Sequence, residues 1–482
     1  MSGAEETIEI ITPEQWFSLL KQRVAETKWE GWRSRGPTIF KVPRIFQEAD
    51  PKAYEPKMVS LGPYHHGNIH LKAMEDLKWH YLKKFLGRNP DKPLEGYIEQ
   101  IKEGELEARM AYSEKVNMSS DEFSQMMLLD CCFVIEIIHS WKPFVEIQEK
   151  PSLFARMRLP MSVHQTDETE TEGVQNPISS TRYILPAIAR DMLMLENQLP
   201  FFLLRTLFDS AYPDKPDLLK GHALEFFRET FMNREMKLTS GDVYHLLHMI
   251  HSSISPPEKN RDDGEPFGFC WPLQSMKKPR HLPKDDPEGT DRPTRQLKWI
   301  PSATQLMEAG VHFRKKETAT NLLDVTFHNG VMEIALLQVD DSTETFLRNL
   351  IAFEQCSKNV SLHVTAYAAL MDCIINTAAD VALLQQHGII LSGLGDGKQV
   401  ASLFNQLCKE VTLDYKKSYV SGIYKDVNEH FDTKCNRWRA RLNHDYFSNP
   451  WAVISLFAAI LLFVLATTQT IYSALSYVRP PN

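Results

Sequence analysis

The sequence lacks an excess of positive charge, and this excludes one broad class of function. Its 482 residues include 54 Lys and Arg against 62 Asp and Glu, which gives a net charge of −8 and a pI near 6.1. Binding a phosphate backbone needs a clustered basic face, and no long basic stripe occurs outside one short segment near the C-terminus. We therefore expect no nucleic-acid partner.

The sequence also lacks the regular cysteine spacing of known motifs. The seven cysteines are scattered and none forms a CxxC pair, so the spacing of a zinc site or a redox motif is missing. Several lie in apolar helical runs, which indicates reduced, mostly buried thiols, as on the cytosolic side of a membrane. The N-terminal residues form neither a basic nor an apolar signal region, so no secretory signal is visible.

Catalytic signatures are missing as well. There is no G-x-S-x-G elbow, HExxH or protein-kinase signature. The segment 393–398, GLGDGK, resembles a phosphate loop, but Ser392 and Gln399 occupy the positions where that motif requires a glycine and a Ser or Thr. It also fails as a dinucleotide fingerprint because no strand clearly precedes it. We expect a loop that enters a helix.

Four histidines, at positions 65, 66, 70 and 80, raise the question of a metal site. Zinc needs three or four convergent ligands, and this spacing matches no common pattern. Adjacent histidines on an extended segment point to opposite sides. We expect structural or surface histidines, and neither a metal nor a cofactor. Catalytic partners need not be near in sequence, so an enzyme with an unrecognised active site stays open as the alternative.

An apolar run near the C-terminus is the clearest feature of the chain. No charged side chain occurs from Tyr446 to Val478, and residues 451–475 supply 25 positions where a membrane span needs about 20. Twelve of the 25 are Leu, Ile, Val or Phe. Each is worth roughly −0.3 to −0.6 kcal/mol near a bilayer centre, which outweighs the cost of the polar cluster at 467–470. We expect one transmembrane helix with Trp451 at an interface.

The flanks of this run predict its orientation. Four basic residues precede it: Lys434, Arg437, Arg439 and Arg441. Only Arg479 follows it, so the positive-inside rule places the bulk of the chain in the cytosol. The position of the run near the end predicts tail-anchored insertion, and its length suits a plasma membrane better than an endomembrane. Asn117 and Asn359 begin Asn-X-Ser triplets, which would report exposure to the secretory lumen.

Hydrophobic periodicity predicts a mostly α-helical fold with a small β-hairpin element. The hairpin is centred on Asn329 and Gly330 within a strand-like run at 322–339. A capping box is expected at 302–305, and residues 341–344 are expected to cap a helix through Cys356. The expected helices cover about residues 71–85, 95–113, 121–140, 183–210, 222–236, 241–252, 303–309, 344–356, 362–386, 398–411 and 415–448.

Composition predicts the domain organisation. The expected parts are an N-terminal helical extension at 1–36, a body at 37–445, the transmembrane helix at 451–475 and a short tail at 476–482. Two irregular insertions are expected within the body. Residues 164–177 carry four acids and almost nothing to bury, and residues 255–295 hold eight prolines among many charges.

A polar cluster interrupts two apolar runs near residue 200. It consists of Arg190 and Asp191 and of Glu196, Asn197 and Gln198, which precede Pro200. Polar groups in so apolar a context must be paired, since burying one unpaired costs a few kcal/mol. Proline disfavours helical geometry at the residue before it, so we expect a break between two helices. A buried structural network is the main interpretation, and a functional pocket is the other.

Blocks spread over nearly the whole chain resemble a plant family known as domain of unknown function 247. The most specific blocks are SLGPYHHG at 60–67 and LENQLPFFLL at 195–204, and others are IFKVPRIF at 39–46, LLDCCFVIEII at 128–138, IPSATQLMEAGVHF at 300–313 and LRNLIAFEQC at 347–356. The family-motif residues are Pro43, Gly62, Pro63, Tyr64, His65, His66, Gly67, Glu75, Lys78, Glu196, Asn197, Gln198 and Pro200.

The resemblance implies a land-plant source and a single-pass membrane protein at the plasma membrane. It implies no reaction and assigns no catalytic residue, although some grass members look like pollen-side determinants of self-incompatibility, which suggests recognition. We therefore expect a membrane-anchored interaction or signalling module with unknown protein partners. The alternative is a membrane-anchored enzyme with an unrecognised active site. Ser455 and Ala459 also permit close helix approach, so a homo-oligomer stays open.

Overall fold

The computed structural model describes residues 17–18, 21, 36–140, 178, 183–213, 218–232, 241–256, 299–433 and 450–478. The chain divides into two compact units, Met1–Pro37 and Thr38–Asn482. Several sequence expectations lie outside the described residues: most of the N-terminal extension, the insertion at 164–177, the proline-rich insertion beyond residue 256, the basic residues at 434–441 and the last four residues.

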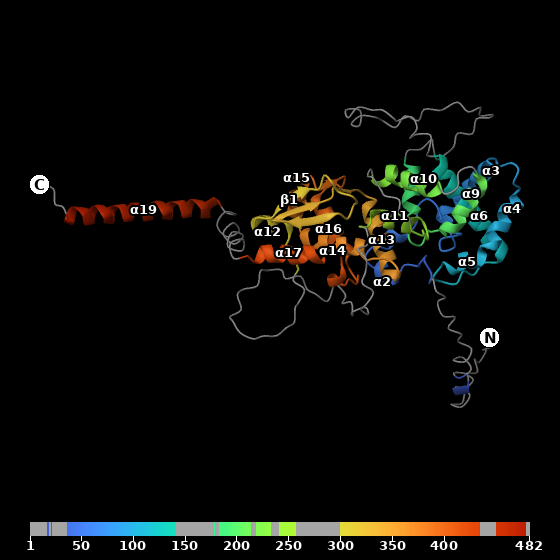
Figure 1. Cartoon of the computed structure of the whole chain (residues 1–482), viewed down its shortest axis with the longest axis horizontal. Coiled ribbons are helices and arrows are strands. Elements are labelled where there is room, and N and C mark those ends of the chain that lie inside the picture. The colour runs from blue at the N-terminus through green and yellow to red at the C-terminus, as the bar shows by residue number, and fades with distance from the viewer. Residues whose placement is uncertain are drawn as a thin grey trace, which may run out of the picture. The chain divides into compact units, whose positions relative to one another are not determined.

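A helix that is apolar on every side forms the centre of the N-terminal part of the body. In α6 (Ser120–Ser140) every side chain from Phe123 to Ile138 except Gln125 is buried. Such a helix must be enclosed by others. The helices packed on it are α3 (Lys72–Leu86), α4 (Leu94–Glu103), α9 (Phe201–Ala211) and α10 (Leu218–Phe227) (Figure 1).

Shorter elements complete this part of the body: α2 (Arg44–Gln47), η1 (Pro51–Tyr54), η2 (Ile69–Leu71), α5 (Glu105–Met110), α8 (Ile184–Asp191), η5 (Arg228–Met232) and α11 (Leu246–Ile254). The single helix expected at 95–113 is wrong, because Gly104 separates α4 from α5. A Cβ at Gly104 would lie 3.0 Å from side-chain atoms of Phe202 and Leu203, so glycine permits close packing on α9. The single helix expected at 183–210 is wrong, whereas the break expected before Pro200 is confirmed, since α8 ends at Asp191 and α9 begins at Phe201.

The C-terminal part of the body contains two small sheets. In the first, β1 (His312–Lys315) pairs in parallel with β3 (Val331–Ile334), and β2 (Val325–His328) pairs antiparallel with the same strand. The β2–β3 hairpin confirms the expected Asn-Gly turn, because Asn329 and Gly330 have φ of 52° and 78°. A tight two-residue turn of this kind needs positive φ at both positions.

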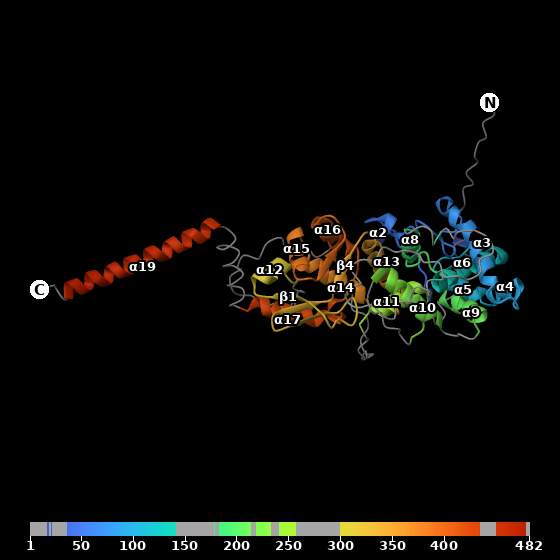
Figure 2. The same cartoon turned by 90° about the horizontal axis from the view of Figure 1, so that it is seen from above.

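In the second sheet, β4 (Leu337–Val339) pairs in parallel with β5 (Ile390–Ser392). The helices of this part are α12 (Ala303–Glu308), α13 (Thr343–Cys356), α14 (His363–Ile374), α15 (Ala378–Gln386), α16 (Gly397–Leu407), η7 (Tyr415–Lys417) and α17 (Ser421–Asp432). Helices α11 and α13 lie between the two parts of the body in both views (Figure 1 and Figure 2). The fold is therefore mostly α-helical with a small β component.

Three expectations for this part differ from the structure. The helix expected at 362–386 is two helices bent by 105°, because Thr377 and Asp380 form a reciprocal capping box that starts α15. The helix expected from 415 is interrupted between η7 and α17. The helix expected to end at Cys356 does so, but the cap expected from residues 341–344 is not made by them. Instead, the carboxylate of Asp340 accepts the N–H groups of residues 342 and 343. The box at Ser302 is confirmed.

The segment 393–398 enters a helix as expected, but a strand, β5, does precede it. Three residues of strand are too short to stand out in the sequence. The Oδ1 atom of Asp396 accepts the N–H of Lys398 at 3.0 Å, so a carboxylate already caps the N-terminus of α16. This arrangement opposes a bound anion at that helix end.

The apolar run folds as one continuous helix, α19 (Pro450–Val478). Among the residues whose side chains are described, no single helix meets both the length and the hydropathy expected of a membrane span. Phe457–Ser473 is apolar but shorter than the required length, and α14 with α15 qualifies only as a bent pair. From Val364 to Ile374 the side chains of α14 are buried inside the body.

Candidate functional site

The turn between α8 and α9 holds the extended segment that precedes α3. Asp191 is fully buried, and its Oδ2 accepts the backbone N–H groups of residues 57, 58 and 59 at 2.9, 2.5 and 3.1 Å. Its Oδ1 lies 2.7 Å from the Arg190 guanidinium. Burial raises the pKa of Asp191, and the interaction with Arg190 opposes this rise. One carboxylate thus fixes the path of three consecutive residues.

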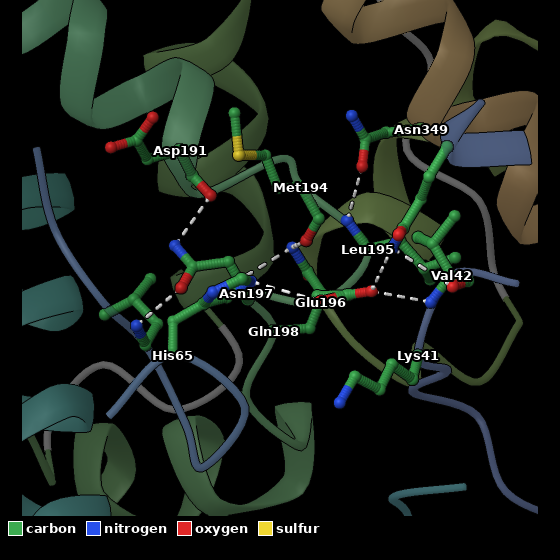
Figure 3. A network of polar contacts seen from close by, with 12 residues as sticks. Lys41, Val42, His65, Asp191, Met194, Leu195, Glu196, Asn197, Gln198 and Asn349 are labelled. Atoms are coloured by element: carbon green, nitrogen blue, oxygen red, sulfur yellow. Dashed lines mark hydrogen bonds and ion pairs between the residues drawn. The ribbon is translucent and has the colours of Figure 1, made fainter. Parts of the chain in front are cut away.

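Glu196 holds the same segment at two further points (Figure 3). Its Oε1 accepts the N–H of Val42 at 2.7 Å and the amide of Gln47 at 3.4 Å. Its Oε2 lies 3.3 Å from Nε2 of His65, and the two side chains are 6 % and 13 % exposed. Glu196 therefore joins the beginning of the segment to the GPYHHG block.

The side-chain amide of Asn197 is hydrogen-bonded through both its oxygen and its nitrogen. Its Oδ1 accepts the N–H of Leu61 at 2.7 Å, and its Nδ2 donates to the carbonyl oxygens of Val59 at 3.0 Å and Asp191 at 2.9 Å. The side chain is completely buried. All three backbone groups would lose a partner together if this side chain were removed.

The side chain of Gln198 binds the backbone of its own turn. Its Nε2 donates to the carbonyl oxygens of Met192 and Met194, both at 2.7 Å, while its Oε1 accepts the N–H of Leu247 in α11 at 3.0 Å. The turn is thereby attached to a helix from a distant part of the sequence. We call Asp191, Glu196, Asn197 and Gln198, with the segment 42–62 that they bind, the polar network.

Gly62 ends the part of the segment held by the network. Its φ is +70°, and an added Cβ would lie 2.7 Å from the Tyr112 hydroxyl and 2.9 Å from the carbonyl oxygen of Gln198. Only glycine combines this backbone conformation with so close an approach. Its N–H donates to Oδ2 of Asp130 at 2.8 Å.

A buried lysine lies next to this glycine. Nζ of Lys78 donates to the carbonyl of Ser60 and to Oε1 of Glu75, and it lies beside Oδ1 of Asp130, at 2.6 Å in each case. Burial lowers the pKa of Lys78, but the Asp130 and Glu75 carboxylates outweigh this effect and raise it. The ammonium therefore stays charged, with oxygen partners around it.

Two residues of the site were not singled out from the sequence. Asp130 meets both Gly62 and Lys78, while Asn349 of α13 accepts the N–H of Leu195 at 2.8 Å and donates to the carbonyl of Ala53 at 2.9 Å. Asp130 lies inside the apolar run at 128–138, whereas Asn349 follows Arg348 in the mixed stretch at 347–356. The apolar context of Asp130 was the available signal, because burial there requires a partner, and no comparable signal marks Asn349.

Other motif residues lie outside this buried cluster. Pro43, His66 and Gly67 are exposed, and Tyr64 is half-buried with its hydroxyl 3.2 Å from that of Ser113. Within the described parts of the chain, no three His, Cys, Asp or Glu side chains are grouped closely enough to hold a metal ion. The basic residues before α19 and the side chain of Trp451 are outside the described set.

The polar network has a structural role: it connects separate segments of the body. Its carboxylates and amides are hydrogen-bonded to the backbone, and the described cavities are lined by other residues. A catalytic acid or base must reach a substrate. An enzyme built on Glu75, Glu196, Asn197 and the neighbouring histidines therefore finds no support in this geometry.

The protein is a mostly helical body, and the side chains of its polar network bind the protein's own backbone. The chain belongs to the plant family DUF247, described as plant protein of unknown function, whose pattern matches residues 39–465. This confirms the resemblance seen in the sequence.

Two proteins of Arabidopsis thaliana are similar over most of their length. The UPF0481 protein At3g47200 is 28 % identical over 448 residues, which cover 92 % of this chain and 87 % of the relative. The putative UPF0481 protein At3g02645 is 23 % identical over an alignment of 508 positions, with coverage of 90 % and 89 %. No solved structure matches the chain.

Proposed function

We propose that this plant protein is a membrane-anchored interaction module, in which α19 is the anchor and the helical body presents a surface to protein partners. The observation that carries the proposal is the exposure of α19. Its large apolar side chains are 52–71 % exposed: Phe457, Ile460, Leu461, Leu462, Phe463, Val464, Leu465, Ile471 and Tyr472. Six consecutive residues, 460–465, cover more than one full turn of 3.6 residues. The helix is thus apolar on every side, which suits a lipid environment.

The polar cluster of α19 is compatible with lipid. The hydroxyls of Thr467, Thr468 and Thr470 donate to carbonyl oxygens of the preceding turn at 2.7–2.9 Å. In a bilayer every polar group needs an internal partner, and this back-bonding supplies one for each threonine. The whole helix of 29 residues would measure about 43 Å at 1.5 Å per residue, against a hydrocarbon core of about 30 Å.

The body is also consistent with an interaction role, because its polar network holds one segment of the chain in a fixed conformation at the surface. The polar network fixes the segment 42–62 against α11 and α13, which places the GPYHHG block at the surface with His66 and Gly67 exposed. Confinement to a membrane raises the effective concentration of any partner on the same membrane. A cytosolic orientation, the plasma membrane and self-association through α19 are further parts of this proposal.

The test is proximity labelling in plant cells with the full chain. The control is an anchor variant, Leu461→Arg with Leu465→Arg, which adds about 5–7 kcal/mol to the cost of insertion and leaves the body unchanged. We expect a reproducible set of labelled membrane proteins with the native chain and its loss with the variant. Labelling equal to that of a free cytosolic ligase would contradict the proposal.

A further inference from the structure

A cleft beside α11 belongs to no motif of the family. Its volume is about 730 Å³, and it is bordered by α11, by residues 359–361 before α14, by His363 at the start of α14 and by the turn at Thr320 and Asn321. Sites for small molecules measure roughly 300–1,000 Å³. The cleft is therefore large enough for a small ligand, and its lining shares no residue with the polar network.

A buried carboxylate orients one histidine of the cleft. Oε1 of Glu354 lies 2.7 Å from Nε2 of His251, and the same carboxylate accepts the N–H groups of Val364 and Thr365, both at 2.7 Å, at the N-terminus of α14. A carboxylate bound to two backbone N–H groups only accepts, so Nε2 of His251 carries a proton. In the neutral ring Nδ1 is then a hydrogen-bond acceptor.

A second histidine of the cleft has the opposite tautomer. Nδ1 of His248 accepts the N–H of Tyr244 at 3.2 Å, so its neutral ring carries the proton on Nε2. The rings of His248 and Tyr244 are stacked, with centroids 4.4 Å apart and planes 12° apart. Burial lowers the pKa of His248 to about 4, so this ring is uncharged at neutral pH.

Both histidines line the cleft, so their remaining ring nitrogens can offer a ligand one donor, Nε2 of His248, and one acceptor, Nδ1 of His251. His248 and His251 are three residues apart in α11, and residues at this spacing lie on one face of a helix about 5–6 Å apart. A hydroxyl group both donates and accepts, so adjacent hydroxyl groups on one molecule match such a pair. The stacked Tyr244 adds a flat aromatic surface.

The charge of the described lining favours an uncharged ligand. The described lining contains no lysine or arginine and one carboxylate, that of Asp242, whereas Ser252, Thr320 and Asn359 contribute neutral polar groups. An anion would find no counter-charge, and a single carboxylate at an open rim is a weak cation site. We propose that this cleft binds a small, uncharged, hydroxyl-rich molecule of the carbohydrate class between His248 and His251.

The test is saturation-transfer NMR on the full chain in lipid nanodiscs. The probes are sucrose, maltose and cellobiose, with glucose 6-phosphate as the charged comparison. Asn359→Arg places a long side chain at the exposed rim of the cleft without changing the core. Asn117→Arg is the matched control, because Asn117 is also exposed, lies outside this cleft and also begins an Asn-X-Ser triplet.

We expect transfer to at least one neutral disaccharide, an affinity at least tenfold weaker in Asn359→Arg, and native affinity in Asn117→Arg. His251→Gln, which removes the ring acceptor, should also weaken binding if thermal unfolding shows that it folds. The inference is overturned by absence of transfer to all three sugars, by equal binding in the two arginine variants, or by preference for glucose 6-phosphate.

Discussion

The replacement Asn197→Leu tests the polar network most sharply. Leucine has a similar volume but no polar atom, so the N–H of Leu61 and the carbonyl of Val59 would lose their partner, while the carbonyl of Asp191 would keep only the N–H of Met194. Each unsatisfied buried group costs about 1–3 kcal/mol. With two such groups, we expect the free energy of unfolding to fall by about 2 kcal/mol or more, a large part of the roughly 5–15 kcal/mol typical of a folded domain.

The assay is pulse proteolysis of the full chain in increasing urea, in lipid nanodiscs. Asn117→Leu is the control, because Asn117 is exposed and a surface substitution changes stability by about 0.5 kcal/mol or less. Proximity labelling of the folded variant separates structure from partner binding. If Asn197→Leu were as stable as Asn117→Leu, the hydrogen bonds of Asn197 would not hold the segment and the structural interpretation of the network would fail.

Two further predictions concern the contacts of Lys78 and Gly62, and a third concerns the proposed orientation of the body. Lys78→Met should lower stability by about 3–5 kcal/mol, because it leaves buried carboxylate and carbonyl oxygens without their cation. The folded pKa of Lys78 is raised, so its contribution is complete below the unfolded value of about 10.4 and is lost as pH rises through the folded value. Proteolysis between pH 6 and 9 should show a constant deficit, and a deficit that disappears within this range would refute the assignment. Gly62→Ala should destabilise the chain more than Gly67→Ala in thermal unfolding. Both glycines have positive φ, but only at Gly62 does an added Cβ meet other atoms, and equal losses would contradict the close approach. In the proposed cytosolic orientation Asn117 and Asn359 would not enter the lumen, so treatment with a glycosidase should leave gel mobility unchanged. A shift at either asparagine would reverse the proposed orientation.

The sequence predicts the parts of the fold that depend on local patterns. The Asn329–Gly330 turn, the capping box at Ser302 and the break before Pro200 all form, because each is determined by residues within a few positions. The long helix expected at 362–386 fails although the signal for its break, the capping box of Thr377 and Asp380, is local in the sequence. Its apolar run continues through the bend, since both α14 and α15 bury apolar side chains in the same core.

The candidate site was predictable in part. Apolar context alone indicates that Glu196, Asn197 and Gln198 must be paired, but it does not identify partners more than a hundred residues away, such as Val42 and Leu61. Most of those partners are backbone groups, which leave no signature in the sequence. The cleft at α11 was missed for the same reason, because His251 is brought to Glu354 only by the packing of α11 on α13.

Membrane anchoring by α19 is the central claim, and alkaline carbonate extraction of membranes from expressing plant cells tests it most directly. The native chain should stay in the membrane pellet after extraction. The anchor variant, with arginine at positions 461 and 465, should be found in the supernatant as a folded body. Release of the native chain by carbonate, or retention of the variant in the pellet, would contradict the claim that α19 holds this protein in a membrane.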